Sequence, residues 1–140
     1  MLLSQSIILK SFITNKYLFI SKEHGISFDQ SDIKKSDILK LRYEGKYITL
    51  KSKYGYISLN NGNIDFNEEI GNNERFEIEY LDENWFRLKA NNGFYISVQN
   101  DGKLNVNQKN IDNNEKLLMN VTQKESVFEF LDFWLFELKI

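Results

Sequence analysis

The chain has 140 residues, and 41% of them are hydrophobic, so we expect one domain with a single hydrophobic core over residues 1–140. Its 18 basic and 20 acidic side chains give a formal net charge of −2, which argues against a nucleic-acid partner, because phosphate neutralisation needs an excess of positive charge. The absence of cysteine excludes disulfides and thiolate metal sites.

The N-terminal stretch 1–11 (MLLSQSIILKS) is predicted to be the first strand. It has neither a basic start nor a long apolar run, so it does not have the pattern of a secretory signal. Together with the missing cysteines, this favours a cytoplasmic location. No run approaches the 18 or so apolar residues that would span a bilayer, and we expect no transmembrane segment.

Three segments, which follow one another along the chain, share the same landmarks. Each opens with a Leu-Lys pair and continues to a tyrosine, and the tyrosines are 39 residues apart. A glycine turn and a short alternating strand follow, and a further alternating strand closes each copy. The sequence therefore predicts three repeats of about 40 residues with four strands each, at approximately 8–47, 48–85 and 86–131. The landmark tyrosines are Tyr17, Tyr56 and Tyr95, and the turn glycines are Gly25, Gly62 and Gly102.

The alternation of these strands places apolar side chains on one face and Lys, Asn, Ser, Asp and Glu on the other. Three four-stranded units would each leave exposed edges, and closing them into one barrel removes these edges. We therefore predict an all-β fold, a β-trefoil of twelve short antiparallel strands. The expected core includes Leu9, Leu18, Ile20, Ile26, Phe28, Leu39 and Leu41.

The end of the third repeat allows two interpretations. The closing strand lies either at 117–121 or at 127–131. The apolar C-terminal segment 126–140 has ten apolar residues among its 15. It either completes the barrel or forms a surface for self-association or a partner, with Phe133, Trp134 and Phe136 as its candidate contacts.

The stretch from Arg75 to Val106 (RFEIEYLDENWFRLKANNGFYISVQNDGKLNV) resembles the fascin-like β-trefoils, the group that contains fascin and the hisactophilins. The resemblance implies the trefoil fold and a protein partner, with actin-type cytoskeletal filaments as the example. His24 is the single histidine, so the histidine cluster of the hisactophilins is missing. The Gln-x-Trp motif of the ricin-type trefoil lectins is missing too, and Trp85 follows Glu83 and Asn84 instead.

No motif in the sequence points to catalysis. Acidic pairs alternate with apolar residues or flank turns, and neither a catalytic triad in a family context nor a phosphate-binding glycine loop is present. We therefore expect a binding module without enzymatic activity, cofactor or metal. A protein partner is the first interpretation, and a homo-oligomer or larger complex through the C-terminal segment is compatible with it.

A carbohydrate-binding, lectin-like module is the alternative. Loops rich in asparagine could hydrogen-bond sugar hydroxyls, and neighbouring aromatic rings, Trp85 among them, could stack on a sugar. The same residues are also what tight turns require. The candidate ligand loops contain Tyr54, Asn60, Asn61, Asn63, Asn91, Asn92, Phe94, Asn100 and Asp101.

Overall fold

The computed structural model describes residues 4–23, 25–82, 84–108 and 112–122. Within these residues the chain forms twelve strands, all paired antiparallel, and three short 3-10 helices, which confirms the all-β prediction. The strands are β1 (Ser4–Ser11), β2 (Tyr17–Ser21), β3 (Gly25–Gln30), β4 (Leu39–Glu44), β5 (Tyr47–Ser52), β6 (Gly55–Asn60), β7 (Asn63–Asn67), β8 (Phe76–Asp82), β9 (Trp85–Lys89), β10 (Tyr95–Val98), β11 (Leu104–Gln108) and β12 (Leu117–Val121). The helices are η1 (Ile33–Lys35), η2 (Asn72–Glu74) and η3 (Asn113–Glu115).

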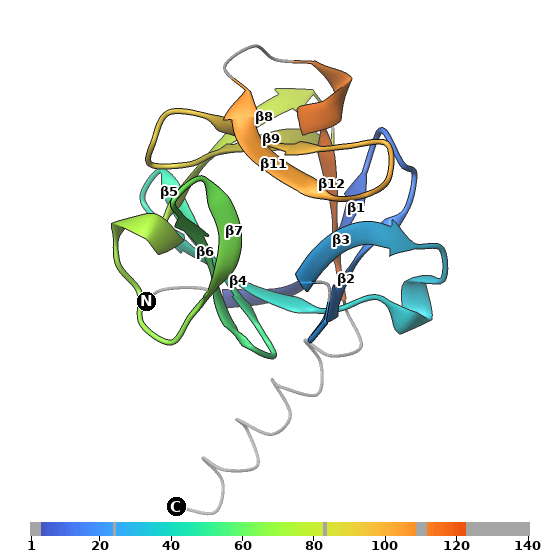
Figure 1. Cartoon of the computed structure of the whole chain (residues 1–140), viewed down its shortest axis with the longest axis horizontal. Coiled ribbons are helices and arrows are strands. Elements are labelled where there is room, and N and C mark those ends of the chain that lie inside the picture. Colours follow the sequence, from blue (N-terminus) through green and yellow to red (C-terminus); the bar gives the residue numbers. More distant parts are fainter. Residues whose placement is uncertain (1–3, 24, 83, 109–111, 123–140) are drawn as a thin grey trace, which may run out of the picture.

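Six of the strands close into a ring. The pairings run from β1 to β4, β5, β8, β9 and β12, and β12 pairs with β1 again. The hairpins β2–β3, β6–β7 and β10–β11 surround one end of this barrel (Figure 1). A barrel closed in this way leaves no free edge among its six strands, and the threefold arrangement is the β-trefoil that the repeats predict.

The barrel interior repeats the same position three times. Ile7, Ile48 and Phe86 each lie opposite the first residue of β4, β8 or β12, and all three are at most 2% exposed. Burying an apolar side chain of this size contributes about 1.5–3 kcal/mol to stability, so this ring holds the barrel together. All seven core residues expected from the first repeat are buried.

The landmark tyrosines have a structural reason. In each repeat the lysine of the Leu-Lys pair lies opposite the landmark tyrosine of the next strand. The lysine Nζ lies over the tyrosine ring, 5.4, 5.4 and 6.0 Å from the ring centroid. A cation over an aromatic face is attracted by the ring, so the Leu-Lys and Tyr landmarks mark one contact that is made three times. The pairs are Lys10–Tyr17, Lys51–Tyr56 and Lys89–Tyr95.

The glycine turns of two hairpins differ in their surroundings. Gly62 and Gly102 both have positive φ, +81° and +90°. A Cβ at Gly62 would meet nothing within 4 Å, whereas a Cβ at Gly102 would lie 2.8 Å from the carbonyl oxygen of Phe28. The Phe28 N–H donates to the Gly102 carbonyl at 2.8 Å, so this turn docks on the first hairpin.

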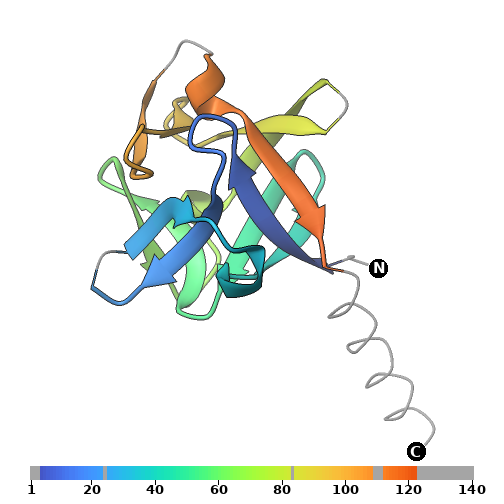
Figure 2. The same cartoon turned by 90° about the vertical axis from the view of Figure 1, so that its right-hand side faces the viewer.

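The closing strand of the barrel is β12 at Leu117–Val121, one of the two alternatives. Figure 2 shows β12 beside β1, with which it pairs over five residues from Ile7 to Ser11. The other alternative, 127–131, and the candidate contacts Phe133, Trp134 and Phe136 lie outside the described residues.

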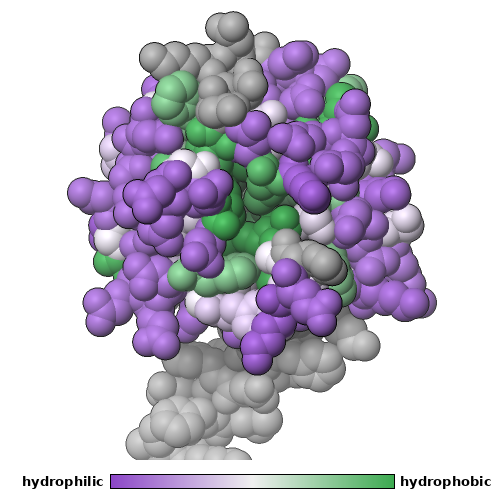
Figure 3. Space-filling view, viewed as in Figure 1, coloured by the Kyte–Doolittle hydropathy of each residue, from purple (hydrophilic) through white to green (hydrophobic). Residues whose placement is uncertain are grey.

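The space-filling view shows apolar residues at the bottom of a hollow between the three hairpins (Figure 3). Ile64, Phe66 and Leu104 of these hairpins are partly buried and pack against the core. The hydrophobic core therefore continues from the barrel into the hairpin layer. The surrounding surface is hydrophilic in the same view.

Candidate functional site

The outer face of the barrel carries three equivalent rows of side chains. Each row starts one position before the buried ring residue, crosses three barrel strands and ends on a landmark tyrosine. We name the rows by their first residues. The Ser6 row is Ser6, Lys40, Lys51 and Tyr56, the Tyr47 row is Tyr47, Glu77, Lys89 and Tyr95, and the Trp85 row is Trp85, Leu118, Lys10 and Tyr17.

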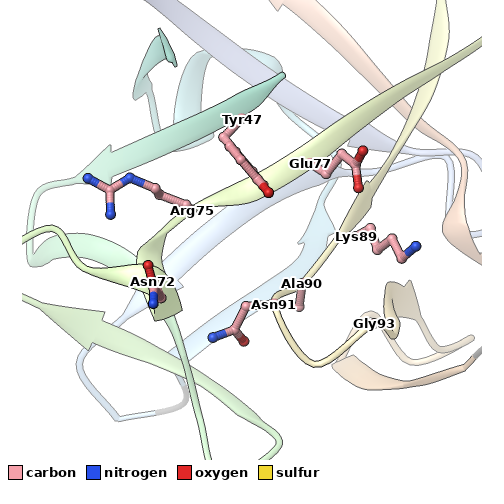
Figure 4. Close-up of a pocket in the computed structure, with 8 residues that line it drawn as sticks. All are labelled: Tyr47, Asn72, Arg75, Glu77, Lys89, Ala90, Asn91 and Gly93. Atoms are coloured by element: carbon pink, nitrogen blue, oxygen red, sulfur yellow. The ribbon is translucent and has the colours of Figure 1, made fainter. Parts of the chain in front are cut away.

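The Tyr47 row forms the floor of a pocket of about 580 Å³. Strands β5, β8 and β9 place the first three residues of this row side by side. The η2 helix and the residue after it form one wall, and the turn between β9 and β10 forms the other (Figure 4). The lining residues are Tyr47, Asn72, Arg75, Glu77, Lys89, Ala90, Asn91 and Gly93.

The polar groups of the pocket surround an open space. Figure 4 shows the Tyr47 ring and the Asn72 and Asn91 side chains around this space, with Arg75 and Lys89 extending to opposite sides. Tyr47 is 38% exposed, and Lys46 Nζ lies 5.3 Å from the centroid of its ring. An exposed aromatic ring beside amide groups can stack on a flat apolar surface and at the same time hydrogen-bond hydroxyl groups.

The charges around the pocket are compensated by neighbours. The Arg75 Nε lies 2.9 Å from Glu44 Oε2, and Lys46 Nζ lies 3.7 Å from Glu77 Oε1. The remaining cation, Lys89, lies over the Tyr95 ring. Two of these three cations are thus paired with carboxylates and one is not, so the pocket suits a ligand without a strong net charge.

A buried carboxylate holds the η2 wall in place. Glu74 is 2% exposed and accepts hydrogen bonds from the Ser58 hydroxyl at 2.5 Å and from the Gly71 N–H at 2.6 Å. Next to it, Asn73 accepts a hydrogen bond from the Asn91 side chain at 2.7 Å. The two walls are therefore tied together, and the rim of the pocket is ordered before a ligand binds.

The floor continues into a charged network on β8, β9 and β10. Arg87 Nη2 lies 2.7 Å from Glu79 Oε1, and the Tyr95 hydroxyl donates to both Glu79 oxygens at 3.1 Å. Burial raises the pKa of Glu79, but the hydrogen bonds from Arg87 and Tyr95 outweigh it and lower the pKa of this carboxyl below its ordinary value of 4.5. Burial and the bond to Glu79 raise the pKa of Tyr95 above its ordinary value of 10.0, so its hydroxyl keeps the proton that it donates to Glu79.

The structure brings one of the predicted loop residues, Asn91, into the pocket lining. Asn92 and Phe94 lie in the same turn, where the Asn92 Oδ1 accepts from the Phe94 N–H at 3.0 Å and the half-buried Phe94 packs against the core. Asp101 makes the same kind of turn bond to the Lys103 N–H. These two polar side chains therefore shape turns.

The other candidate loop residues lie away from this pocket lining. Tyr54 is 42% exposed in the β5–β6 turn, where it packs against Phe66 in a T-shaped arrangement with the ring centroids 5.8 Å apart. Asn61 has a left-handed backbone with φ +51° in the β6–β7 turn. The remaining members of the set are Asn60 and Asn63, which flank that turn, and Asn100, in the β10–β11 turn.

Sequence reasoning missed most of the pocket, including Tyr47, Asn72, Arg75, Glu77 and Lys89. Each of them looks like an ordinary outward position of an alternating strand or a short loop. The signal that could have found them is a comparison of the outward positions of the three repeats. Ser6, Tyr47 and Trp85 are equivalent positions of the three repeats and differ in chemistry, whereas the interior residue that follows each of them is apolar in all three repeats.

The other two rows have different chemistry. The Ser6 row is basic, and it borders pockets lined by Lys40, Arg42, Lys51 and Lys53. Trp85, the first residue of the Trp85 row, packs against Phe12 in a T-shaped arrangement with the ring centroids 5.2 Å apart. Lys116 Nζ lies over the Phe12 ring, 5.2 Å from its centroid. Phe12 is 42% exposed, so this row presents an aromatic surface.

Two further features concern the part of the chain that the structure describes. Among these residues no group of three or more His, Cys, Asp or Glu side chains gathers where a metal ion could bind. No helix among them is long and apolar enough to span a membrane.

Comparisons with known proteins agree with the architecture. Solved structures similar to this one include that of SeviL bound to asialo-GM1 saccharide, with a TM-score of 0.72 and 12% identity over 84% of this chain and 98% of that chain. The designed 3-fold symmetric protein ThreeFoil is similar with a TM-score of 0.68 and 15% identity over 81% of this chain and 96% of that chain. At these identities the likeness concerns the β-trefoil fold. No curated protein sequence matches the chain significantly.

The family comparison agrees with the resemblance that the repeats suggested. The profile of the Fascin domain family matches residues 14–119, which is most of the chain. Fold and family together support a binding module. The chain belongs to the Fascin domain family.

Proposed function

We propose that this protein is a non-enzymatic binding module that holds an uncharged saccharide in the pocket above the Tyr47 row. The observation that carries the proposal is the combination of one exposed aromatic ring with amide groups on two tied walls and charges that are mostly paired. This reverses the order expected from the sequence, in which a protein partner came before a glycan.

A sugar has apolar C–H groups and polar hydroxyl groups, and the pocket offers partners for both. The Tyr47 ring offers an apolar face to the C–H groups of a sugar ring, and the Asn72 and Asn91 amides offer donors and acceptors to hydroxyl groups. Glu77 adds a carboxylate that can accept from a hydroxyl. Because the walls are tied through Asn73 and Asn91, binding costs little ordering of the protein.

A glycan array probed with the labelled protein tests the proposal. We expect hits on uncharged oligosaccharides, and we expect Tyr47→Ala to weaken binding of the best hit at least about tenfold, because it removes the stacking surface. Asn91→Ala should also weaken it. Tyr54→Ala is the matched control, since Tyr54 is similarly exposed outside this pocket and should leave binding unchanged.

Two results would contradict the saccharide site. One is an array without uncharged hits next to a trefoil lectin that gives its own hits. The other is a saccharide whose binding depends on Tyr54 and not on Tyr47, which would move the site to the loop near β6.

A protein partner is the second candidate, and the aromatic surface of the Trp85 row favours it. Phe12, Trp85 and Leu118 lie together there, and aromatic residues are enriched in the centres of protein interfaces. Actin-type filaments are the partner that the fascin-like pattern suggests. Co-sedimentation with actin filaments tests this: binding should fall in Phe12→Ser and persist in Tyr47→Ala, and an absence of co-sedimentation removes the actin proposal.

A further inference from the structure

The Ser6 row borders a concentration of positive charge. Two adjoining pockets of about 260 and 430 Å³ share Lys40 and Lys51 among their lining residues. Arg42 lines one of them and Lys53 the other, and no acidic side chain lines either. Four cations thus gather on one face of a chain whose formal net charge is −2.

The strand register forces these charges together. Lys40 lies directly opposite Lys51 on the neighbouring strand, and Arg42 follows Lys40 on the same face of β4. Residues directly opposite one another have Cβ atoms about 4.5–5.5 Å apart, and like charges in this arrangement are destabilising. An anion between the lysines would remove this repulsion.

Neighbouring groups compensate part of the charge, and Lys40 is also engaged in an interaction. Asp37 Oδ1 lies 3.1 Å from Lys53 Nζ, and Lys51 lies over the Tyr56 ring. The buried Arg42 Nε makes no hydrogen bond to any atom of the described chain. A buried donor of this kind normally has a partner, so an acceptor from outside the chain is expected near it.

The basic pocket is the repeat equivalent of the saccharide pocket. Lys40 stands where Glu77 stands in the Tyr47 row, and Lys53 stands where Asn91 stands. The lysine that contacts the landmark tyrosine is retained in both. Two cations in the basic pocket therefore stand at the positions of a carboxylate and an amide in the saccharide pocket. The basic pocket suits an anionic ligand, whereas the saccharide pocket suits an uncharged one.

We propose that the Ser6 row, with Lys40, Arg42, Lys51 and Lys53, is a second binding site that takes the sulfate or carboxylate groups of an acidic glycan. The anion site rests on its own lining, and only the choice of a glycan as the carrier rests on the proposed saccharide function. Nucleic acid fits less well, because the lining has a single aromatic ring, Tyr56, whereas single strands are bound by stacking successive bases on several rings.

Isothermal titration with a heparin decasaccharide tests the site. We expect binding that weakens as salt is raised, because each lysine or arginine that pairs with a heparin anion releases a counterion from heparin. Lys40→Gln and Lys51→Gln should each weaken it at least about threefold, as expected for the loss of one partly exposed charge pair. Lys10→Gln is the matched control: it removes the same lysine–tyrosine contact in the Trp85 row, and it should leave heparin binding unchanged.

Three results would overturn the inference. They are an absence of heparin binding at low salt, an equal loss in Lys10→Gln and Lys51→Gln, and binding of duplex DNA as tight as binding of heparin. Tyr47→Ala should keep heparin binding, which separates the two sites. If the array of uncharged glycans fails while heparin binding depends on Lys51, the saccharide pocket fails and the anion site stands.

Discussion

Equivalent positions of the three repeats carry similar residues in the interior of the barrel and different residues on its outer face. Inside, Ile7, Ile48 and Phe86 are three apolar side chains with the same burial at the same position. On the outward side, one residue earlier, the equivalents are Ser6, Tyr47 and Trp85, of which Ser6 is covered by its neighbours and fully buried. Interior positions must fill one shared core, whereas outward positions are limited mainly by the strand geometry. Differences in side-chain chemistry between the repeats are therefore concentrated in the three outer rows.

The largest expected effect separates neighbouring residues on the two faces of β9. Phe86→Ala empties a position in the buried ring and should lower the free energy of unfolding by about 3–5 kcal/mol. Trp85→Ala removes a half-buried ring from the outer face and should cost about 1 kcal/mol. Urea denaturation measures both. Equal losses would show that the outer row is as constrained as the core.

The next effect compares two turns that look alike in the sequence. Gly102→Ala places a Cβ against the Phe28 carbonyl, so the hairpin has to move, whereas Gly62→Ala meets open space. Both pay about 1–2 kcal/mol for a side chain at positive φ. We expect Gly102→Ala to lose at least about 1 kcal/mol more than Gly62→Ala in thermal or urea unfolding. Equal losses would argue against the docking of this turn.

The smallest effect concerns the charged network beside the Tyr47 row. Because the folded pKa of Glu79 is lowered, its stabilisation is present above the ordinary value of 4.5 and is lost as the pH falls through the lowered pKa. Glu79→Gln should therefore reduce the free energy of unfolding near neutral pH by about 1 kcal/mol and flatten its decline in acid. Glu69→Gln, in an exposed loop, controls for the loss of one charge. A parallel acid decline in Glu79→Gln and the unaltered protein would contradict this account.

The repeats made the fold predictable, because the same physical contact recurs. The lysine and tyrosine landmarks are cross-strand partners, and Gly62 and Gly102 have the positive φ that their Asn-Gly and Asp-Gly pairs predict. The closing strand was ambiguous, because both alternatives alternate in the same way. The closing strand β12 is identified by its pairing with the first strand, β1, and no local sequence pattern reveals a pairing between strands so far apart in the chain.

The pocket was less predictable than the fold. Asn91 was found because it lies in an asparagine-rich loop, but Tyr47 and Glu77 come from different repeats and meet only through the register of β5 and β8. The asparagines that the sequence suggested as ligands include Asn92, which is engaged in turn geometry. The contacts expected of Phe133, Trp134 and Phe136 stay a prediction.

The central claim is that the Tyr47 row and the Ser6 row bind different ligands, and nuclear magnetic resonance of the ¹⁵N-labelled protein tests it most directly. Titration with the best uncharged saccharide should shift the side-chain amide signals of Asn72 and Asn91 and the backbone signal of Gly93. Titration with the heparin decasaccharide should instead shift the backbone signals of Lys40 and Lys51. Shifts at one common row for both ligands, or at Phe12 and Trp85 for either of them, would contradict the account.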